Sequence, residues 1–199
     1  MSPKPNVSAE RIPQILNAAL AVFAAKGLNR ATMSDVAEAA GLSKATVYLY
    51  FKDKDDLIYF ALLTSLEQGF GNLEGILVSG GEVKSQILDW VQEIASQMAE
   101  SATNLSIGFE FYALANRRPE IRERIQKYFQ QYRQLLSEVI QKGITQGEFQ
   151  SVEADSIAVA IIALFEGFNV LWFTEPNDAS WLSLLANTIK LLLDSISLN

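Results

Sequence analysis

Apolar residues recur every three or four positions along most of the chain, which places them on one face of an α-helix. This pattern predicts an all-α protein of about nine helices, with glycine and proline at many of the expected boundaries. The helices are expected over residues 11–26, 34–40, 44–51, 53–77, 82–100, 104–115, 119–142, 154–174 and 178–196.

The first helix is expected to begin at or after Glu10, because a proline such as Pro13 is tolerated in a first turn but breaks a helix interior. Residues 1–8 then form a mobile arm. In the expected helix 53–77, glycines weaken the second half. That half either packs closely against a neighbouring element or forms a flexible segment that can move. The sequence leaves both alternatives open.

The stretch 32–54 reads TMSDVAEAAGLSKATVYLYFKDK and predicts two short helices joined by a tight turn. Ser34 and Asp35 can cap the first helix, and Gly41 ends it as a left-handed C-cap. Ser43 supplies the N-cap oxygen of the second helix. The pattern is therefore typical of a helix-turn-helix.

On the second helix, Val47 and Phe51 fall within one narrow arc and are expected to pack inward. The opposite side and the flanks offer a cation, methyl groups, a hydroxyl and a phenol. A recognition helix in the DNA major groove needs such groups for base edges and phosphates. The outer residues are Lys44, Ala45, Thr46, Tyr48 and Leu49. Tyr50 lies between the inner and outer sides, and Lys54 lies at the start of the next helix.

A set of residues at fixed spacing extends this pattern over about 45 positions. The set is Ile15, Leu16, Ala18, Ala19, Phe23, Gly27, Thr32, Val36, Ala37, Ala40, Gly41, Leu42, Ser43, Val47, Tyr48, Tyr50, Phe51, Lys54 and Leu57. In these residues the segment resembles the DNA-binding domain of the TetR/AcrR family of transcriptional regulators. The rest of the chain is similar to the family only in length and helical pattern.

The resemblance implies a DNA-binding domain over residues 1–53 and a ligand-binding and dimerisation domain over residues 54–199. It also implies a homodimer in which the last two helices of each subunit form a four-helix bundle, so that the two DNA-binding domains read a palindromic operator. Tyr48 and Tyr50 can instead be half-buried aromatics, and Lys44 a solvated lysine. The implied DNA contacts are Thr32, Ser34, Ser43, Lys44, Ala45, Thr46, Tyr48, Leu49, Tyr50 and Lys54.

Aromatic residues of the expected ligand-binding domain can line a cavity for an apolar or amphipathic small molecule. Ordinary core packing is the alternative for each of them. A carboxylate inside an apolar helix is costly unless it is paired. Glu166 is therefore expected to meet a cation or donor, or to pair with Arg117 or Arg133. The candidate ligand contacts are Trp90, Met98, Phe109, Glu110, Tyr112, Phe165, Glu166, Phe168, Asn169 and Trp172.

Composition restricts the chemistry of the protein. The 199 residues include no cysteine and no histidine, which removes the usual zinc ligands and the common general base. No Gly-rich phosphate loop, metal-ligand cluster or nucleophile motif is found, so a helical enzyme is disfavoured and no cofactor or metal is expected.

The net charge of −7 is unevenly distributed. Residues 1–60 carry seven basic and six acidic side chains, a net charge of +1, whereas the remaining 139 residues carry nine basic and seventeen acidic ones, a net charge of −8. A nearly neutral N-terminal part joined to an acidic C-terminal part predicts DNA binding that is sensitive to salt and restricted in orientation.

The stretch 157–173 resembles a membrane span, but it is short and contains Glu166 and Asn169. A helix buried in a core and a subunit interface is the preferred explanation. No signal peptide is visible, so a cytoplasmic protein is expected.

These patterns predict a ligand-responsive regulator, a repressor or less often an activator. Its effector is expected to shift the helix expected over residues 53–77 and to move the two DNA-binding domains of the dimer apart. The alternative is a DNA-binding protein of the same fold that a protein partner controls.

Overall fold

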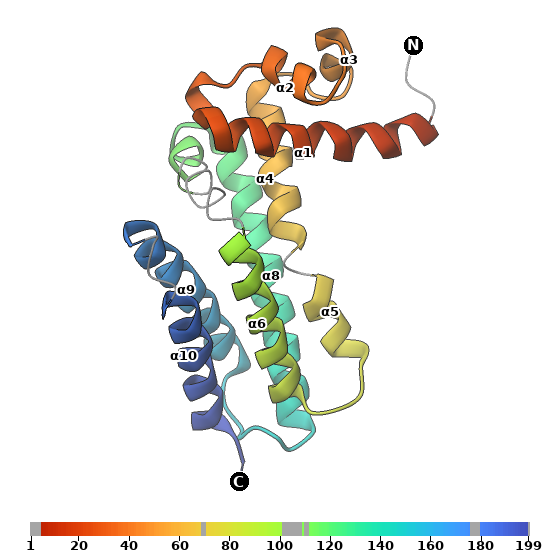
Figure 1. The fold of residues 1–199 in the computed structure, drawn as a ribbon. Helices are drawn as coiled ribbons and strands as arrows, with labels where there is room; N and C mark the ends of the chain where they lie inside the picture. The colour runs from red at the N-terminus through yellow and green to blue at the C-terminus, as the bar shows by residue number, and fades with distance from the viewer. Residues whose placement is uncertain (1–4, 69–70, 101–108, 110–111, 176–179, 199) are drawn as a thin grey trace. The chain divides into compact units, whose positions relative to one another are not determined.

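The computed structural model describes residues 5–68, 71–100, 109, 112–175 and 180–198. The regular secondary structure within these residues is helical, which confirms the all-α class (Figure 1). Residues 112–117 are also helical, whereas most of the helix expected over 104–115 lies outside the described residues. The helices are α1 (Pro5–Arg30), α2 (Met33–Ala39), α3 (Lys44–Tyr48), α4 (Lys54–Gln68), α5 (Gly71–Val78), α6 (Val83–Glu100), α8 (Pro119–Thr145), α9 (Ala154–Thr174) and α10 (Ser180–Ile196).

The chain divides into two compact units. The first comprises residues 1–68 and 103–121, and the second comprises residues 69–102 and 122–199. α4 belongs to the first unit because it packs against α1. The functional boundary expected at residues 53 and 54 stays a prediction, and this packing division differs from it.

The core of the first unit lies between α1, α2 and α4. Ile15 and Ala19 of α1 have 0% exposed surface, as do Leu57 and Ala61 of α4. Helical spacing predicts all four as buried, because it places each of them on the apolar face of its helix. These contacts hold the helix-turn-helix on a packed support.

The start of α1 differs from the sequence expectation. α1 begins at Pro5, not after Glu10, and Pro13 lies inside it. Residues 5–8 of the expected arm are therefore helical. The proline removes one hydrogen bond to the preceding turn, but its ring is exposed, and the buried residues described for α1 begin after it, at Ile15. Gly27, with φ 75° and ψ 155°, interrupts the helix where its end is expected.

The single helix expected over residues 53–77 is wrong. The structure has α4, which ends at Gln68, and a separate helix α5, which begins at Gly71. The glycines of this region have a low helix propensity, and this favours an interruption over one continuous helix. α5 then packs on α6 in the second unit.

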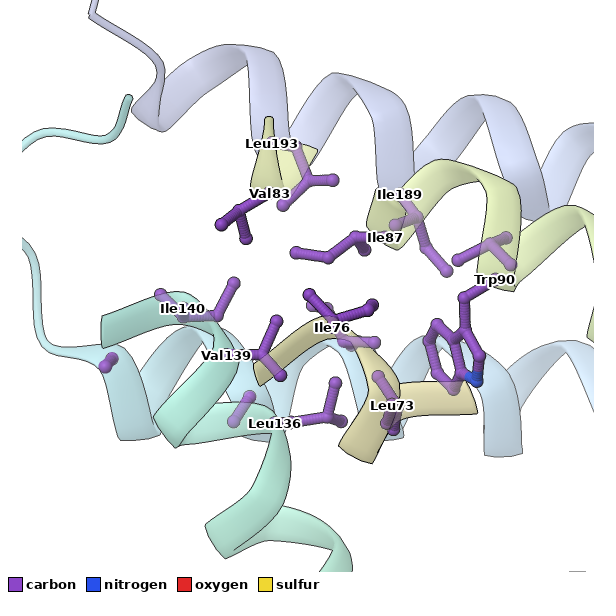
Figure 2. Packing of buried hydrophobic residues seen from close by; sticks show 14 of the residues in the cluster. Leu73, Ile76, Val83, Ile87, Trp90, Leu136, Val139, Ile140, Ile189 and Leu193 are labelled. Atoms are coloured by element: carbon purple, nitrogen blue, oxygen red, sulfur yellow. The ribbon is translucent and has the colours of Figure 1, made fainter. Parts of the chain in front are cut away.

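The core of the second unit is formed by side chains that converge from several helices (Figure 2). Ile87 of α6 and Leu136 and Ile140 of α8 have 0% exposed surface, which confirms the apolar faces predicted for these helices. The labelled side chains are Leu73 and Ile76 of α5, Val83, Ile87 and Trp90 of α6, Leu136, Val139 and Ile140 of α8, and Ile189 and Leu193 of α10.

Two charged residues near the end of α8 cap neighbouring helices. The Lys142 Nζ donates hydrogen bonds to the carbonyl oxygens of Ile76 at 2.5 Å and Ser79 at 2.6 Å, near the end of α5. The Glu148 carboxylate accepts hydrogen bonds from the first two N–H groups of α6, at 2.8 and 3.0 Å. Each charge has the sign that the adjacent helix end favours.

The turn after α8 packs tightly. A Cβ added at Gly143 would lie 2.4 Å from the ring of Phe149, whose exposed fraction is 1%. Backbone pairing holds the same turn against the C-terminal segment, because Gln150 N donates to the Ile196 carbonyl at 2.7 Å and Leu198 N donates to the Glu148 carbonyl at 2.8 Å. The absence of a side chain at residue 143 lets this turn close.

Candidate nucleic-acid interface and effector site

α2 is held by a capping box at its N-terminus. Thr32 has an extended backbone, its Oγ1 accepts a hydrogen bond from Asp35 N at 3.2 Å, and its N–H donates to Asp35 Oδ2 at 2.8 Å. The expected cap at Ser34 is therefore wrong, because Ser34 lies inside the first turn of α2, where it is exposed. Asp35 does take part in the cap, as the third helical residue.

Asp35 also connects α2 to α1. Its Oδ1 lies 2.7 Å from Lys26 Nζ. The hydrogen bond from Lys26, followed by those from Thr32, lowers the pKa of Asp35 to about 2. The carboxylate is therefore ionised at neutral pH and holds the first helix of the motif on its support.

The turn between α2 and α3 follows the predicted pattern. Gly41, with φ 64°, ends α2, and Leu42 N donates to the Ala37 carbonyl at 2.8 Å, as in a Schellman motif. Ser43 caps α3 by accepting a hydrogen bond from Thr46 N at 3.0 Å. The predicted roles of Gly41 and Ser43 are confirmed.

α3 is shorter than expected, because it ends at Tyr48 and not near Phe51. Val47 and Phe51 are 0% and 2% exposed, which confirms that they pack inward. Tyr48 and Leu49 are 46% and 64% exposed.

The other predicted contacts surround these two residues. Lys44 and Ala45 are exposed, and Thr46 and Tyr50 are half-buried. The Lys44 Nζ lies 5.9 Å from the centroid of the Tyr48 ring. α3 therefore presents a cation, an aromatic ring and aliphatic groups on its outer side.

Lys54, the first residue of α4, is half-buried. Its Nζ donates to the Asn29 carbonyl in α1 at 3.2 Å, so it helps to hold α4 against α1. Asp53 precedes it, and its Oδ1 accepts a hydrogen bond from Asp56 N at 2.8 Å. The start of α4 is thus positioned beside the motif by contacts within the first unit.

Sequence reasoning missed Arg118, which directly precedes α8. Its guanidinium pairs with the Asp55 carboxylate in the first turn of α4. A hydrogen bond with Glu120, followed by the charge of Asp55, raises the pKa of Arg118. These partners could not be read from the sequence, because Arg118 and Asp55 are 63 positions apart.

The candidate effector contacts of the second unit include a cluster of aromatic rings. The Trp90 ring centroid lies 5.3 Å from that of Phe165 and 6.3 Å from that of Tyr132, both edge-on. Trp90, Phe165 and Trp172 are 3%, 6% and 5% exposed. Tyr132 of α8 was not among the predicted ligand contacts, although its helical spacing marks it as an inward residue.

Glu166 is half-buried and influences this cluster. Burial raises the pKa of Tyr132 well above its ordinary value, and the charges of Tyr128 and Glu166 raise it further. Arg133, one of the expected partners of Glu166, has its Nε 3.2 Å from Asp155 Oδ1. The cluster therefore combines aromatic faces with a nearby carboxylate.

The remaining candidate contacts are dispersed. Phe168 and Asn169 are half-buried on α9, and the Phe168 ring lies 6.0 Å from that of Trp181, whose buried Nε1 has no hydrogen-bond partner among the described residues. Phe109 and Tyr112 belong to the first unit. Met98 and Glu110 lie outside the side chains that the structure describes. Across the described part of the chain, no group of three acidic side chains is placed to hold a metal.

α9 is long and apolar enough to cross a bilayer by length and composition, and it is the one helix in the described ranges of which this is true. Only 22% of its most apolar 18-residue window is buried within the single chain. Much of its apolar surface is therefore available for another contact.

A capped two-helix motif on a packed support, with an outward cation and phenol on its second helix, defines a helix-turn-helix protein. The chain belongs to the tetR family of bacterial regulatory proteins. The family's N-terminal profile matches residues 15–59, and the profile of the C-terminal domain of BetI-type transcriptional repressors matches residues 84–194. Members of this family are transcriptional regulators and not enzymes.

Known proteins agree with this assignment. The chain is 32% identical over 191 residues to the HTH-type transcriptional regulator YfiR of Bacillus subtilis, covering 94% of this chain and 92% of YfiR. It is 25% identical over 190 residues to the nicotine-responsive repressor HdnoR of Paenarthrobacter nicotinovorans, covering 95% and 97%. The crystal structure of Bacillus subtilis FadR in complex with stearoyl-CoA shares the fold, with a TM-score of 0.75, 22% identity, and coverage of 91% and 96%.

Proposed function

We propose that this transcriptional regulator is a repressor that binds a palindromic operator as a homodimer and is released by a small-molecule effector. The observation that carries the proposal is the outer side of α3, where Lys44, Tyr48 and Leu49 are exposed while Val47 is buried. This division is what a recognition helix in a major groove requires. The proposed DNA contacts are Thr32, Ser34, Ser43, Lys44, Ala45, Thr46, Tyr48, Leu49, Tyr50 and Lys54.

The proposed dimer interface is formed by α9 and α10. On α9, Val159 and Val170 are 45% and 48% exposed, and a Cβ added at Gly167 between them would meet nothing within 4 Å. On α10, Leu184 and Leu191 are 44% and 68% exposed. Burial of these faces against a second copy accounts for the apolar character of α9 without a membrane. We accordingly place the protein in the cytoplasm.

The proposed effector is an apolar or amphipathic molecule that binds the second unit. HdnoR, a relative over nearly the whole chain, is named as nicotine-responsive, and the FadR structure contains stearoyl-CoA. Trp90, Tyr132 and Phe165 offer aromatic surface, and Glu166 offers a charge for a donor or cation. The predicted set Trp90, Met98, Phe109, Glu110, Tyr112, Phe165, Glu166, Phe168, Asn169 and Trp172 stays a prediction.

The DNA-binding proposal is tested by fluorescence anisotropy with DNA from the region upstream of the gene, at two salt concentrations and against scrambled DNA. Wild type is compared with Lys44→Ala and Tyr48→Ala, and with Lys127→Ala as a charge-matched control from the exposed side of α8. We expect specific, salt-weakened binding that the first two substitutions reduce and the control retains. Equal affinity of all four proteins would contradict the assigned interface.

The effector proposal needs a second experiment, because a protein partner could also control the same fold. A panel of apolar and cationic amphiphiles is added to the preformed complex of protein and operator. Release by one compound, lost on Trp90→Ala while operator binding is retained, supports a small-molecule effector. Retention of the complex with every compound favours control by a protein partner.

A further inference from the structure

The centre of the outer side of α3 is aliphatic. At about 100° per residue, Ala45 and Leu49 each project about 160° from the buried Val47, one on either side of the outward direction. Leu49 follows the last residue of α3 and keeps helical torsions, with φ −71° and ψ −24°. Its side chain is 64% exposed, so a branched aliphatic group is presented where a recognition helix meets base edges.

The polar side chains of the same helix are engaged or lie on its flanks. The Ser43 Oγ accepts a hydrogen bond from Thr46 N at 3.0 Å and is hydrogen-bonded to Thr46 Oγ1 at 2.8 Å. The Lys44 ammonium lies over the ring of Tyr48, 5.9 Å from its centroid. Contacts of such flanking groups with phosphate position a protein on DNA but carry no sequence information directly. Sequence discrimination at the centre is therefore left to the aliphatic groups.

The major groove offers one kind of apolar group, the 5-methyl of thymine. We propose that Leu49, with Ala45 beside it, determines specificity by packing against a thymine 5-methyl in each half of the operator. The inference rests on the proposed function of α3 as a recognition helix. It predicts a thymine that no isosteric base lacking the methyl can replace without loss of affinity.

Deoxyuridine tests this methyl contact specifically, because it differs from thymidine only in lacking the 5-methyl group. The operator is first selected from random duplex DNA with the wild-type protein. Each thymine of a half-site, with its symmetry mate, is then replaced by deoxyuridine. Loss of one methyl contact is expected to weaken binding about fourfold per half-site.

Wild type, Leu49→Ala, Leu49→Met and Val78→Ala are compared on these duplexes. Val78, which is 88% exposed at the end of α5, serves as an aliphatic truncation outside the motif. We expect one thymine position whose replacement weakens wild type, Leu49→Met and Val78→Ala, but leaves Leu49→Ala unchanged because its contact is already absent. The thermal unfolding midpoints of the variants are measured as a folding control.

The outcomes separate the two proposals. Specific binding by wild type without any effect of deoxyuridine, or with the same effect on Leu49→Ala, overturns the thymine contact alone. If wild type selects no sequence at all, the proposed DNA-binding function fails, and the thymine contact fails with it.

Discussion

A lysine at position 191 is expected to dissociate the proposed dimer. Leu184 and Leu191 of α10 are seven residues apart and are 44% and 68% exposed. Leu185, Ile189 and Leu193 of the same helix have 0% exposed surface in the chain's own core. α10 therefore has a second apolar face that the single chain leaves uncovered, and Leu191 is its most exposed member among these residues.

The magnitude follows from the exposed fraction. Full burial of a leucine side chain stabilises by about 1.5–3 kcal/mol, so burial of the 68% that is exposed at Leu191 contributes about 1–2 kcal/mol. A two-fold symmetric interface contains this contact twice, which gives about 2–4 kcal/mol. Leu191→Lys is therefore expected to raise the dimer Kd by about 30-fold to 1,000-fold.

Sedimentation equilibrium over a range of concentrations measures this change directly. The matched control is Val78→Lys, which places the same charge at a site that is 88% exposed on α5. Leucine and lysine have similar helix propensities, so the isolated subunit should fold equally well in the variant. An unchanged dimer Kd for Leu191→Lys, or an equal rise for both variants, would refute the assignment of this face as the interface.

Three further predictions concern the second unit. Glu148→Ala removes the acceptor for the first two N–H groups of α6 and should lower the free energy of unfolding by about 1–3 kcal/mol, measured by urea titration. Gly143→Ala forces a Cβ against Phe149 and should destabilise by about 1–3 kcal/mol, whereas Gly75→Ala, where a Cβ meets nothing within 4 Å, should not. Because burial raises the pKa of Tyr132 in the folded state, its contribution to stability is present below about pH 10 and is lost as the pH rises through the folded pKa. Urea titrations on either side of pH 10 should show this loss in wild type but less of it in Tyr132→Phe.

The local signals of the helix-turn-helix were sufficient to predict much of its structure. Gly41 and Ser43 act within a few residues of their own positions, so their φ angle and hydrogen bond follow from residue type. The bounds of α9, Ala154–Thr174, agree with the prediction because a long apolar run ends shortly before Pro176. Such features need no knowledge of the rest of the fold.

Contacts between distant parts of the chain were not predictable in this way. Lys142 reaches the carbonyl of a residue 66 positions away, and Glu148 reaches the N–H of one 65 positions away. Each reads in the sequence as an ordinary charged surface residue. Pro13 shows the opposite failure, because a valid local rule placed the start of the helix too late, whereas α1 begins at Pro5 and accommodates the exposed proline in its interior.

The candidate effector site was only partly predictable because helical spacing reports burial and not its purpose. Trp90, Tyr132 and Phe165 meet from three different helices, and the sequence places each on an inward face without showing that they meet. The pattern of a core residue and that of a ligand contact are the same at this level. Ligand binding, not helical spacing, distinguishes the two roles.

The composition of α9 follows from the two faces that it presents. Ala158, Ile161 and Phe165 are buried in the core of the second unit, whereas Val159 and Val170 are 45% and 48% exposed. A helix with one inward face alone would be amphipathic, but a helix that also contacts a second subunit is apolar on both sides. The proposed aromatic effector contacts of α9, Phe165 and Trp172, and the proposed partner contacts, Val159 and Val170, thus lie on different faces of one helix. A displacement of α9 by the proposed effector would therefore change the packing of the proposed dimer, because the same helix contributes to both contacts.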